Sequence, residues 1–294
     1  MNLGDEAILQ SIIAQLRNSL DIELTVFSKN AKDTQTRHRV DHVVEVRNLT
    51  RVEITPAIRE LDLFILGGGG IFFDKEAELF LRELEIAHQN SIPSMVYAVG
   101  AGPLNDANSR KRVKEVLNLA DVITVREREA KKTFEDIGVN NQILVTADPA
   151  FLLTPEPLPA DALKSEQVHS ERPLIGVSVR EPGPAAPDID PNFYHGVLAN
   201  AADFLISRLD ADVLFVPFEK QINDTQHSHA VIAKMLQPQH ASVLKGDYTS
   251  GQLLSFMKNF VFTIGMRLHF LIFSALQGVP FVALPYATKV SGLL

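Results

Sequence analysis

Short apolar runs alternate with amphipathic stretches in the first half of this chain. The runs are rich in β-branched and aliphatic side chains, which is typical of parallel strands buried on both faces. We expect strands at Ile22–Phe27, Leu61–Leu66, Ile92–Ala98, Asp121–Val125 and Gln142–Val145, and helices at Lys75–Gln89 and Asn105–Leu119. This alternation predicts an α/β domain with a parallel sheet.

A second series of the same kind begins after Pro173. We expect strands at Leu174–Val179, Val213–Val216, Ser242–Leu244, Val261–Ile264 and Val279–Leu284, and helices at Asn192–Leu209, Thr225–Leu236, Thr249–Asn259 and Met266–Gln277. The stretch between the series, Thr154–Arg172, has three prolines, several charges and no periodicity, as interdomain linkers do. The pattern predicts a Rossmann-like domain over residues 1–155, a linker over 156–172 and a second Rossmann-like domain over 173–294. Ligands of such folds bind at the carboxyl ends of strands, so we expect the active site in the interdomain cleft.

One uncharged stretch resembles a membrane span in composition. Leu268–Thr288 has no Lys, Arg, Asp or Glu over 21 residues. Gly278, Pro280 and Pro285 divide it, and an unbroken helix of about 20 residues does not fit across them. We therefore expect a buried helix followed by a buried strand, and no integral membrane segment.

Composition and charge narrow the function classes. The chain has 294 residues, 46% of them hydrophobic and 22% charged, as in globular proteins of two domains. With a formal charge of -8, the chain lacks the dispersed basic surface that nucleic-acid-binding proteins need. A local basic pocket is still compatible with this charge. The absence of Cys excludes disulfides, cysteine metal sites and thiol nucleophiles. Asp5 and Glu6 stand where a secretory signal has basic and apolar residues, so we expect a cytoplasmic protein.

A run of four glycines, Gly67–Gly70, directly follows an expected strand. Without Cβ atoms the backbone amides of Gly68 and Gly69 can approach a phosphate closely. The alternative is a tight turn packed against a neighbouring loop. Phe72 takes the third glycine position of a dinucleotide fingerprint, so that motif is not met. Gly100–Gly102 follows the next strand, and together the two glycine turns favour a backbone-lined pocket.

Two arginines also follow expected strands. Arg126 comes directly after one strand and Arg180 ends another. An arginine at a strand end suits bidentate binding of a carboxylate or phosphate. The alternative is a surface ion pair, with Glu127 or Glu181 as the partner.

Gly265–His269 is the most informative stretch of the second half. It joins an expected strand to a helix, so Arg267 and His269 should lie in the first helical turn, where the helix dipole favours an anion. The rest of that helix, Phe270–Leu276, is apolar on nearly every side and should be buried. A charged and a titratable side chain beside so apolar an element are costly unless satisfied, which favours a functional site over a structural histidine.

The other histidines do not suggest a metal site. His227 and His229 lie two positions apart, which places them on different faces of a helix. His38 and His42 lack further ligands nearby in the sequence. We expect no metal.

Taken together, seven short motifs resemble the polysaccharide pyruvyl transferases. In order they are Asn2–Ala7, Gly67–Gly70, Gly100–Pro103, Val125–Glu127, Asp148–Ala150, Gly176–Arg180 and Met266–His269. The resemblance spans essentially the whole chain. It implies a glycosyltransferase-B-like fold and transfer of a pyruvyl group from phosphoenolpyruvate to a sugar, usually as a ketal on a bacterial cell-wall or exopolysaccharide unit.

The resemblance also implies roles for particular residues. It places Arg267, Leu268 and His269 at the donor site, within a C-terminal donor-binding domain. Lys289 takes the place of a downstream lysine of the family, and Arg126 and Arg180 match further arginines. With Gly68 and Gly69 as backbone ligands, these cations would hold the carboxylate and phosphate of the donor.

The expected catalytic residues are His269, Arg126 and Lys289. Imidazole titrates near neutral pH, so His269 is the candidate acid–base group. Asp5 and Glu6 are candidates for the acceptor side; the alternative is an ordinary pair of negative charges at a helix amino end.

The chain departs from the family pattern at both ends. Family members have a strand and a glycine loop before the Asn2–Ala7 motif, and further chain beyond the position of Leu294. We therefore expect the first strand of the N-terminal domain and the C-terminal end to be missing. Two alternatives stay open: a nucleotide-sugar glycosyltransferase of the same architecture, and an inactive truncated member.

The partners expected from the resemblance are phosphoenolpyruvate as co-substrate and a glycan acceptor, with no separate cofactor. A lipid-linked acceptor would place the protein at the inner face of the membrane. The chain shows no basic amphipathic helix for binding a membrane surface.

Overall fold

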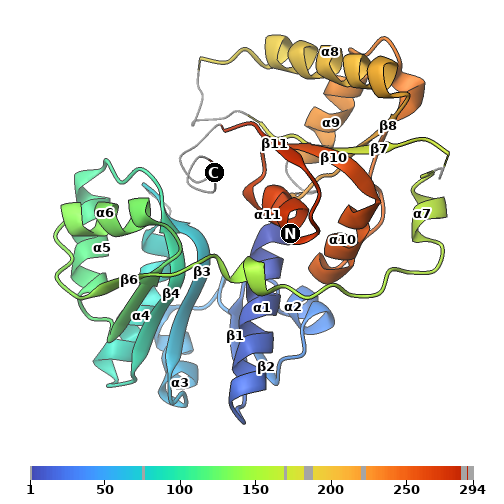
Figure 1. Ribbon diagram of the computed structural model, residues 1–294. Helices are drawn as coiled ribbons and strands as arrows, with labels where there is room; N and C mark the ends of the chain where they lie inside the picture. The colour runs from blue at the N-terminus through green and yellow to red at the C-terminus, as the bar shows by residue number, and fades with distance from the viewer. Residues whose placement is uncertain are drawn as a thin grey trace. The chain divides into compact units, whose positions relative to one another are not determined.

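The computed structural model describes residues 2–74, 77–168, 171–181, 188–219, 223–285 and 290 (Figure 1). The chain forms two compact units. The N-terminal unit is Ile8–Pro149, and the C-terminal unit combines Met1–Ala7 with Ala150–Leu294. The expected boundaries are therefore shifted: the first residues and the segment expected as a linker both belong to the C-terminal unit.

The N-terminal unit has two parallel sheets. Its strands are β1 (Thr25–Ser28), β2 (His42–Glu45), β3 (Phe64–Phe72), β4 (Ser94–Ala101), β5 (Val122–Val125) and β6 (Ile143–Val145). β1 pairs with β2, and a separate four-stranded sheet has the order β3-β4-β5-β6. Each strand of the larger sheet lies beside the next in sequence, which the helical connections between parallel strands permit.

Helices bury the faces of these sheets. They are α1 (Leu3–Ser19), α2 (Ala31–Arg37), α3 (Arg51–Arg59), α4 (Glu78–Gln89), α5 (Ala107–Leu117) and α6 (Arg128–Asp136). One core joins α3, α4, α5 and α6 to β3–β6, with Phe72 and Phe134 packed edge to face at 5.4 Å between ring centroids. Asp106 begins α5 by accepting a hydrogen bond from the Ser109 amide.

The glycine run does not form the expected turn. Strand β3 continues through Gly67–Gly70 to Phe72, and Gly67, Gly69 and Gly70 pair with β4. Gly68 and Gly69 have φ values of +33° and +88°, which glycine adopts without strain. A Cβ on Gly68 would lie 2.2 Å from Ile8 Cγ2, so this glycine lets helix α1 approach the strand closely.

The C-terminal unit has a single five-stranded parallel sheet. Its strands are β7 (Leu174–Ser178), β8 (Asp212–Phe215), β9 (Ala241–Val243), β10 (Phe260–Gly265) and β11 (Phe281–Ala283), in the order β11-β10-β7-β8-β9. The chain passes from β7 to β8 and β9 on one side, and then returns to place β10 on the other side of β7. The strand order thus reverses between β7 and β10.

Helices cover both faces of this sheet. They are α8 (Pro191–Leu209), α9 (Asp224–Ile232), α10 (Ser250–Phe256) and α11 (Leu268–Leu276), with the short α7 (Ala162–Ser165) before them. α8 and α9 form a core with one face of β7, β8 and β9. On the other face α11 packs on β10, where Thr263 Oγ1 lies 2.8 Å from Ser274 Oγ.

The segment expected as a linker is held against the C-terminal unit. Glu166 accepts hydrogen bonds from the amides of Lys245 at 2.8 Å and Gly246 at 2.6 Å. The Ser255 hydroxyl donates to the Glu156 carbonyl oxygen at 2.6 Å. These bonds explain why a stretch without periodicity still has a defined path.

The uncharged stretch is a buried helix followed by a strand, as expected, but the strand is only half-buried. α11 has six buried side chains, whereas β11 is an edge strand in which Val282 is 45% exposed. In the described ranges, no helix has the length and apolarity needed to cross a membrane.

Candidate functional site

The reversal of strand order between β7 and β10 marks the candidate site in the C-terminal unit. Ligands of open α/β sheets bind beyond the carboxyl ends of the strands at such a reversal. Here Ser178 ends β7, Gly265 ends β10, and the two residues pair across the sheet. The loop after β7 carries Arg180, and the loop after β10 carries Arg267 and leads into α11, where His269 lies.

Arg267 is the N-cap residue of α11 and lies one position before the first helical turn in which we expected it. Its Nε donates to Asp224 Oδ2 at 2.9 Å, and its Nη2 lies 2.5 Å from Asp224 Oδ1 and 2.8 Å from Glu219 Oε2. The Arg267 side chain is 13% exposed and that of Asp224 is fully buried. The pair joins the amino ends of α11 and α9.

Asp224 is saturated with hydrogen bonds. Besides Arg267, its Oδ2 accepts the amides of Phe218 at 3.1 Å and Glu219 at 3.0 Å. Burial disfavours the charge of Arg267, but Asp224 and Glu219 more than offset it, so the pKa of Arg267 is raised. The guanidinium is therefore a fixed positive charge. Within the described chain, no carboxylate bonds its Nη1.

His269 lies in the first turn of α11 against the amino end of α1. A Cβ built on Gly4 would stand 2.1 Å from His269 Nδ1 and 2.6 Å from its Cγ, so only glycine leaves room for the imidazole. The Leu3 amide donates to the Phe218 carbonyl oxygen and the Ser250 hydroxyl donates to the Leu3 carbonyl oxygen, both at 2.9 Å. The first and last motifs of the sequence thus meet at His269.

The amino ends of α1 and α11 both lie at this point. Each helix end carries a partial positive charge, which favours an anion, but the first two amides of α1 are already bonded, Leu3 to the Phe218 carbonyl oxygen and Gly4 to Asn2 Oδ1. Asp5 and Glu6 lie in the first turn of α1, as expected, and Asp5 is exposed. That position suits both predictions for them, an acceptor contact and an ordinary acidic helix start.

Arg180 lies two residues beyond β7, and its loop is tied to the β10–α11 loop. Its Nε donates to the Glu181 carbonyl oxygen at 3.0 Å. The Tyr194 hydroxyl lies 3.1 Å from the Arg180 carbonyl oxygen and 2.7 Å from the Met266 sulfur. Burial raises the pKa of Tyr194, so its hydroxyl stays neutral.

Two further histidines lie behind this loop. His195 Nε2 is 2.7 Å from His227 Nδ1. Burial lowers the pKa of both rings, so the pair is neutral at neutral pH. From the sequence we compared His227 only with His229 on its own helix. The pairing with His195, which lies on α8, was therefore not found.

Ser178 is a buried polar residue at the reversal point. Its side chain is fully buried, and its Oγ has no hydrogen-bond partner within the described residues. An unsatisfied buried hydroxyl is uncommon and marks a position that a ligand or water can satisfy.

Arg126 belongs to a separate buried cluster in the N-terminal unit. Its Nε donates to Glu127 Oε2 at 2.8 Å and its Nη1 to Asp148 Oδ2 at 2.9 Å. A Cβ on Gly100 would stand 2.6 Å from Glu127 Oε1 and 2.8 Å from Arg126 Nε, so this glycine makes room for the pair.

The charges of this cluster follow from its burial. Burial opposes the charge on Arg126, yet Asp148 and Glu127 raise its pKa, while burial raises the pKa of Glu127 against the pull of Arg126. Arg126 therefore points into the unit rather than into an open site. This favours the ion-pair alternative, in a buried rather than a surface form.

The remaining predicted residues are divided between the units. Gly68 and Gly69 lie in β3 of the N-terminal unit, whereas Arg180, Arg267, Leu268 and His269 lie together in the C-terminal unit. Lys289 lies outside the described residues. A grouping of three or more metal-ligating side chains is not found in the described part of the chain.

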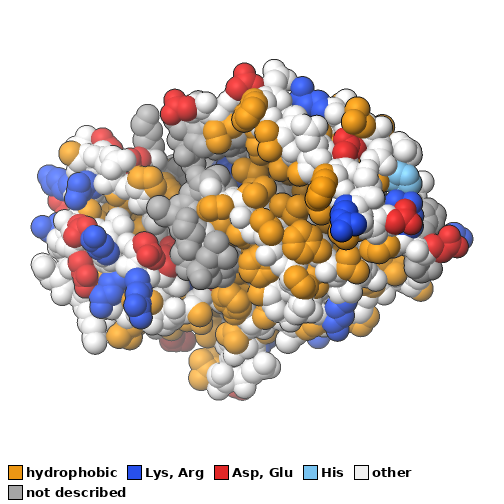
Figure 2. All heavy atoms as spheres, turned by 45° about the horizontal axis from the view of Figure 1, so that its top comes forward, with side chains coloured by type: hydrophobic (Ala, Val, Ile, Leu, Met, Phe, Trp, Pro, Cys, Tyr) orange, Lys and Arg blue, Asp and Glu red, His pale blue; other side chains and the backbone are white. Residues whose placement is uncertain are grey.

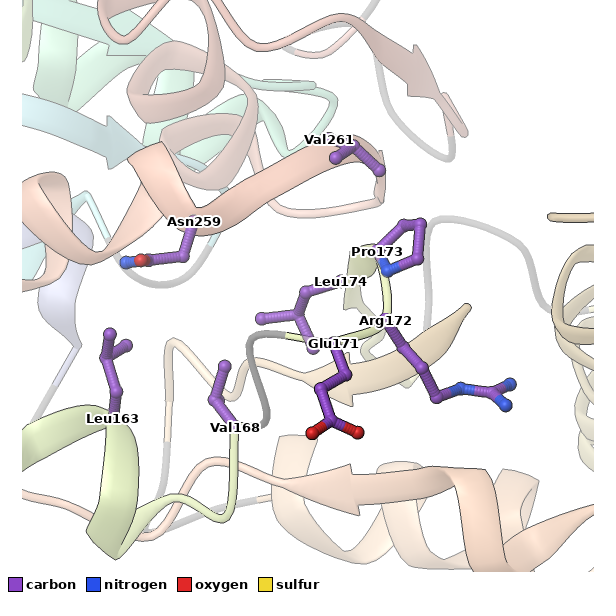
Figure 3. A pocket seen from close by; sticks show the side chains of 8 residues that line it. All are labelled: Leu163, Val168, Glu171, Arg172, Pro173, Leu174, Asn259 and Val261. Carbon is purple, nitrogen blue, oxygen red and sulfur yellow. The ribbon is translucent and has the colours of Figure 1, made fainter. Parts of the chain in front are cut away.

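A cavity of about 440 Å³ lies at the opposite end of the C-terminal sheet (Figure 3). Pro173 and Leu174 line it near the start of β7, and Val261 lines it near the start of β10. Its arginine, Arg172, is bound to Asp210 at 2.7 Å and Asp212 at 3.0 Å. This cavity lies at the amino ends of the strands, whereas ligands of open α/β sheets bind beyond the carboxyl ends, so we assign the candidate site to the carboxyl ends.

Solved structures share the architecture. UDP-N-acetylglucosamine 2-epimerase from Neisseria meningitidis bound to UDP-GlcNAc matches with a TM-score of 0.58 and 12% identity, over 97% of this chain and 81% of that one. The enzyme of the same name from Rickettsia bellii gives 0.58 and 12%, over 96% and 76%. ADP-heptose lps heptosyltransferase II from E. coli gives 0.54 and 16%, over 98% and 85%. At these identities the likeness shows the fold alone: α/β, with Rossmann-like units of the glycosyltransferase-B type.

The sequence comparison identifies the family. No curated protein matches this chain. The family model described as polysaccharide pyruvyl transferase matches residues 2–288, nearly the whole chain, and thus includes the Arg267–His269 corner. The chain belongs to the polysaccharide pyruvyl transferase family.

Proposed function

We propose that this protein transfers a pyruvyl group from phosphoenolpyruvate to a sugar of a bacterial cell-wall or exopolysaccharide unit and forms a ketal. The observation that carries the proposal is the convergence of Arg267, His269 and two helix amino ends at the reversal point of the C-terminal sheet. Family membership supports transfer to a polysaccharide unit.

The site formed by Arg267, His269 and the amino ends of α1 and α11 suits a small donor that carries two negative groups. The amino end of α11 and the helix dipole of α1 favour an anion, and Arg267 adds a guanidinium held in place by Asp224 and Glu219. Arg180, on the facing loop, is the second cation that we assign to the donor. Lys289 stays a predicted third cation for the donor. Arg126 stays a predicted catalytic group, although its pairing with Glu127 and Asp148 favours a structural role.

The proposed reaction begins with a proton transfer from His269 to the methylene carbon of the donor. The adjacent carbon becomes electrophilic, a sugar hydroxyl attacks it, and His269 takes up the hydroxyl proton. A second hydroxyl of the same sugar forms the other C–O bond as the C–O bond to phosphate breaks, and its proton leaves with the phosphate. One ketal and one inorganic phosphate result.

Phosphate release tests the proposal. Purified protein should release phosphate from phosphoenolpyruvate only when a glycan acceptor with two neighbouring hydroxyls is present. Panels of free and lipid-linked glycans would identify the acceptor class. No release with any acceptor, together with no rise in melting temperature on adding phosphoenolpyruvate, would contradict the proposal.

A nucleotide-sugar glycosyltransferase is the second candidate. The structural neighbours include a UDP-GlcNAc-bound epimerase and an ADP-heptose transferase, which favours it at the level of fold. A melting shift with a nucleotide sugar and none with phosphoenolpyruvate would reverse the ranking.

Enlarging Gly4 should displace His269. In the Gly4→Ala variant the new methyl group overlaps the imidazole, so either the ring or the start of α1 must move. We expect turnover to fall about 100-fold, because a shift of about 1 Å in a catalytic group has that effect. Asn18→Ala is the control, since Asn18 is exposed near the other end of the same helix. Equal turnover in the two variants would show that His269 does not need its present position.

A further inference from the structure

Helix α8 presents an apolar row that the described chain leaves uncovered. Phe193 is 72% exposed, Val197 50% and Phe204 65%. Their spacing, together with Asn200 and Arg208, places all five in one row along the helix. Figure 2, in which the top of Figure 1 comes forward, shows hydrophobic side chains gathered on this face of the molecule.

A neighbouring leucine widens the row. The amide of Leu236 donates to Asp203 Oδ2 at 2.8 Å, and Gln237 Nε2 donates to Ser207 Oγ at 2.8 Å, so this segment lies along α8. Leu236 is 85% exposed. We call Phe193, Val197, Phe204 and Leu236 the α8 patch. Four large apolar side chains exposed together on an otherwise acidic protein indicate an interaction surface.

Gly196 adds an independent indication of a close contact. It lies inside α8, where glycine is about 1 kcal/mol less favourable than alanine. A Cβ at this position would meet nothing within 4 Å, so packing inside the protein does not require glycine there. Glycine at this position leaves space for a second backbone to come close to the helix.

We infer that the α8 patch is the interface of a two-fold symmetric dimer, with two α8 helices packed antiparallel. The row is symmetric about Asn200–Ala201, so a two-fold axis there places Val197 opposite the second copy's Phe204, and Phe193 opposite its Arg208. An aromatic ring and a guanidinium attract each other.

The charges at the two ends of α8 also fit a second copy. Asp188 and Asp190 lie at the amino end, and Arg208 lies in the last turn. Antiparallel packing brings Arg208 of each copy toward the acidic end of the other. Asp210 is already bonded to Arg172 at 2.7 Å. The acidic end and the formal charge of -8 make an anionic membrane the poorer partner.

Sedimentation equilibrium over a range of concentrations tests the dimer. The parent should associate reversibly to two copies. Phe193→Ser with Phe204→Ser should raise the dimer dissociation constant about 100-fold or more, because each buried phenylalanine contributes more than a tenfold change. Val52→Ser is the matched control, because Val52 is 81% exposed on a different helix.

A charge exchange tests the antiparallel arrangement. Arg208→Asp should weaken the dimer, and Arg208→Asp combined with Asp188→Arg should restore it. A monomeric parent at every concentration, or an association unchanged by the two serine substitutions, would overturn the inference. A monomer that sediments with phosphatidylglycerol vesicles, and loses this binding in the serine variant, would assign the patch to membranes instead.

Discussion

Replacing His269 with glutamine is expected to lower phosphate release from phosphoenolpyruvate by about 10²–10⁴-fold, the usual contribution of a general acid–base group. Glutamine is close in size to histidine and fits beside Gly4, but its amide neither gives nor takes a proton at neutral pH. The measurement is acceptor-dependent phosphate release at saturating donor. The binding of the donor should change much less, because Arg267 and the helix amino ends are retained.

Two comparisons keep this result interpretable. His229 is an exposed histidine on α9 of the same unit, so His229→Gln should release phosphate at the parental rate. A thermal melt by circular dichroism should show that the His269→Gln variant folds like the parent. A folded variant with nearly parental turnover would remove His269 from the proposed mechanism.

The sequence predicts the alternating architecture well, because buried parallel strands are nearly continuous apolar runs. All five strands of the C-terminal sheet lie within a few residues of their expected positions. The prediction of burial is least accurate for β11, which was expected to be buried and is half-exposed. A half-exposed edge strand can have the same short apolar sequence as a buried strand.

Helices and strands with few apolar residues were not predicted, because they lack the apolar pattern on which the prediction depends. α6 buries only Ala130 and Phe134 among charged neighbours, and β2 has two adjacent half-buried valines between exposed ends. The glycine run fails for a different reason. Gly67–Gly70 has the composition of a turn, and only its pairing with β4 makes it a strand.

In the candidate site, too, some residues could be predicted from the local sequence and others could not. Arg267 and His269 are recognisable because a local pattern, a strand followed by an apolar helix, places them at a helix amino end. Asp224 lies 43 positions from Arg267, and Gly4 lies at the other end of the chain from His269. No periodicity links such positions, so the fold alone reveals these partners.

Replacing Asp224 with alanine is the second large effect that we expect. The substitution leaves the guanidinium of Arg267 and the amides of Phe218 and Glu219 without their buried acceptor. Removing one partner of a buried ion pair costs about 3–5 kcal/mol of the free energy of unfolding. Urea unfolding followed by circular dichroism should therefore show an earlier transition for the C-terminal unit.

Glu219→Ala is the matched comparison within the same network. Glu219 also bonds Arg267, but its side chain is 25% exposed, and Asp224 stays in place to pair the arginine. The loss of stability should then be about 1 kcal/mol or less, the range of partly exposed pairs. The free energy of unfolding should therefore be lowest for Asp224→Ala, intermediate for Glu219→Ala and highest for the parent. This order follows from burial, because of the two carboxylates only Asp224 is fully buried. Equal stability in the two variants would mean that water replaces the Asp224 carboxylate, and that Arg267 is not held by a buried pair.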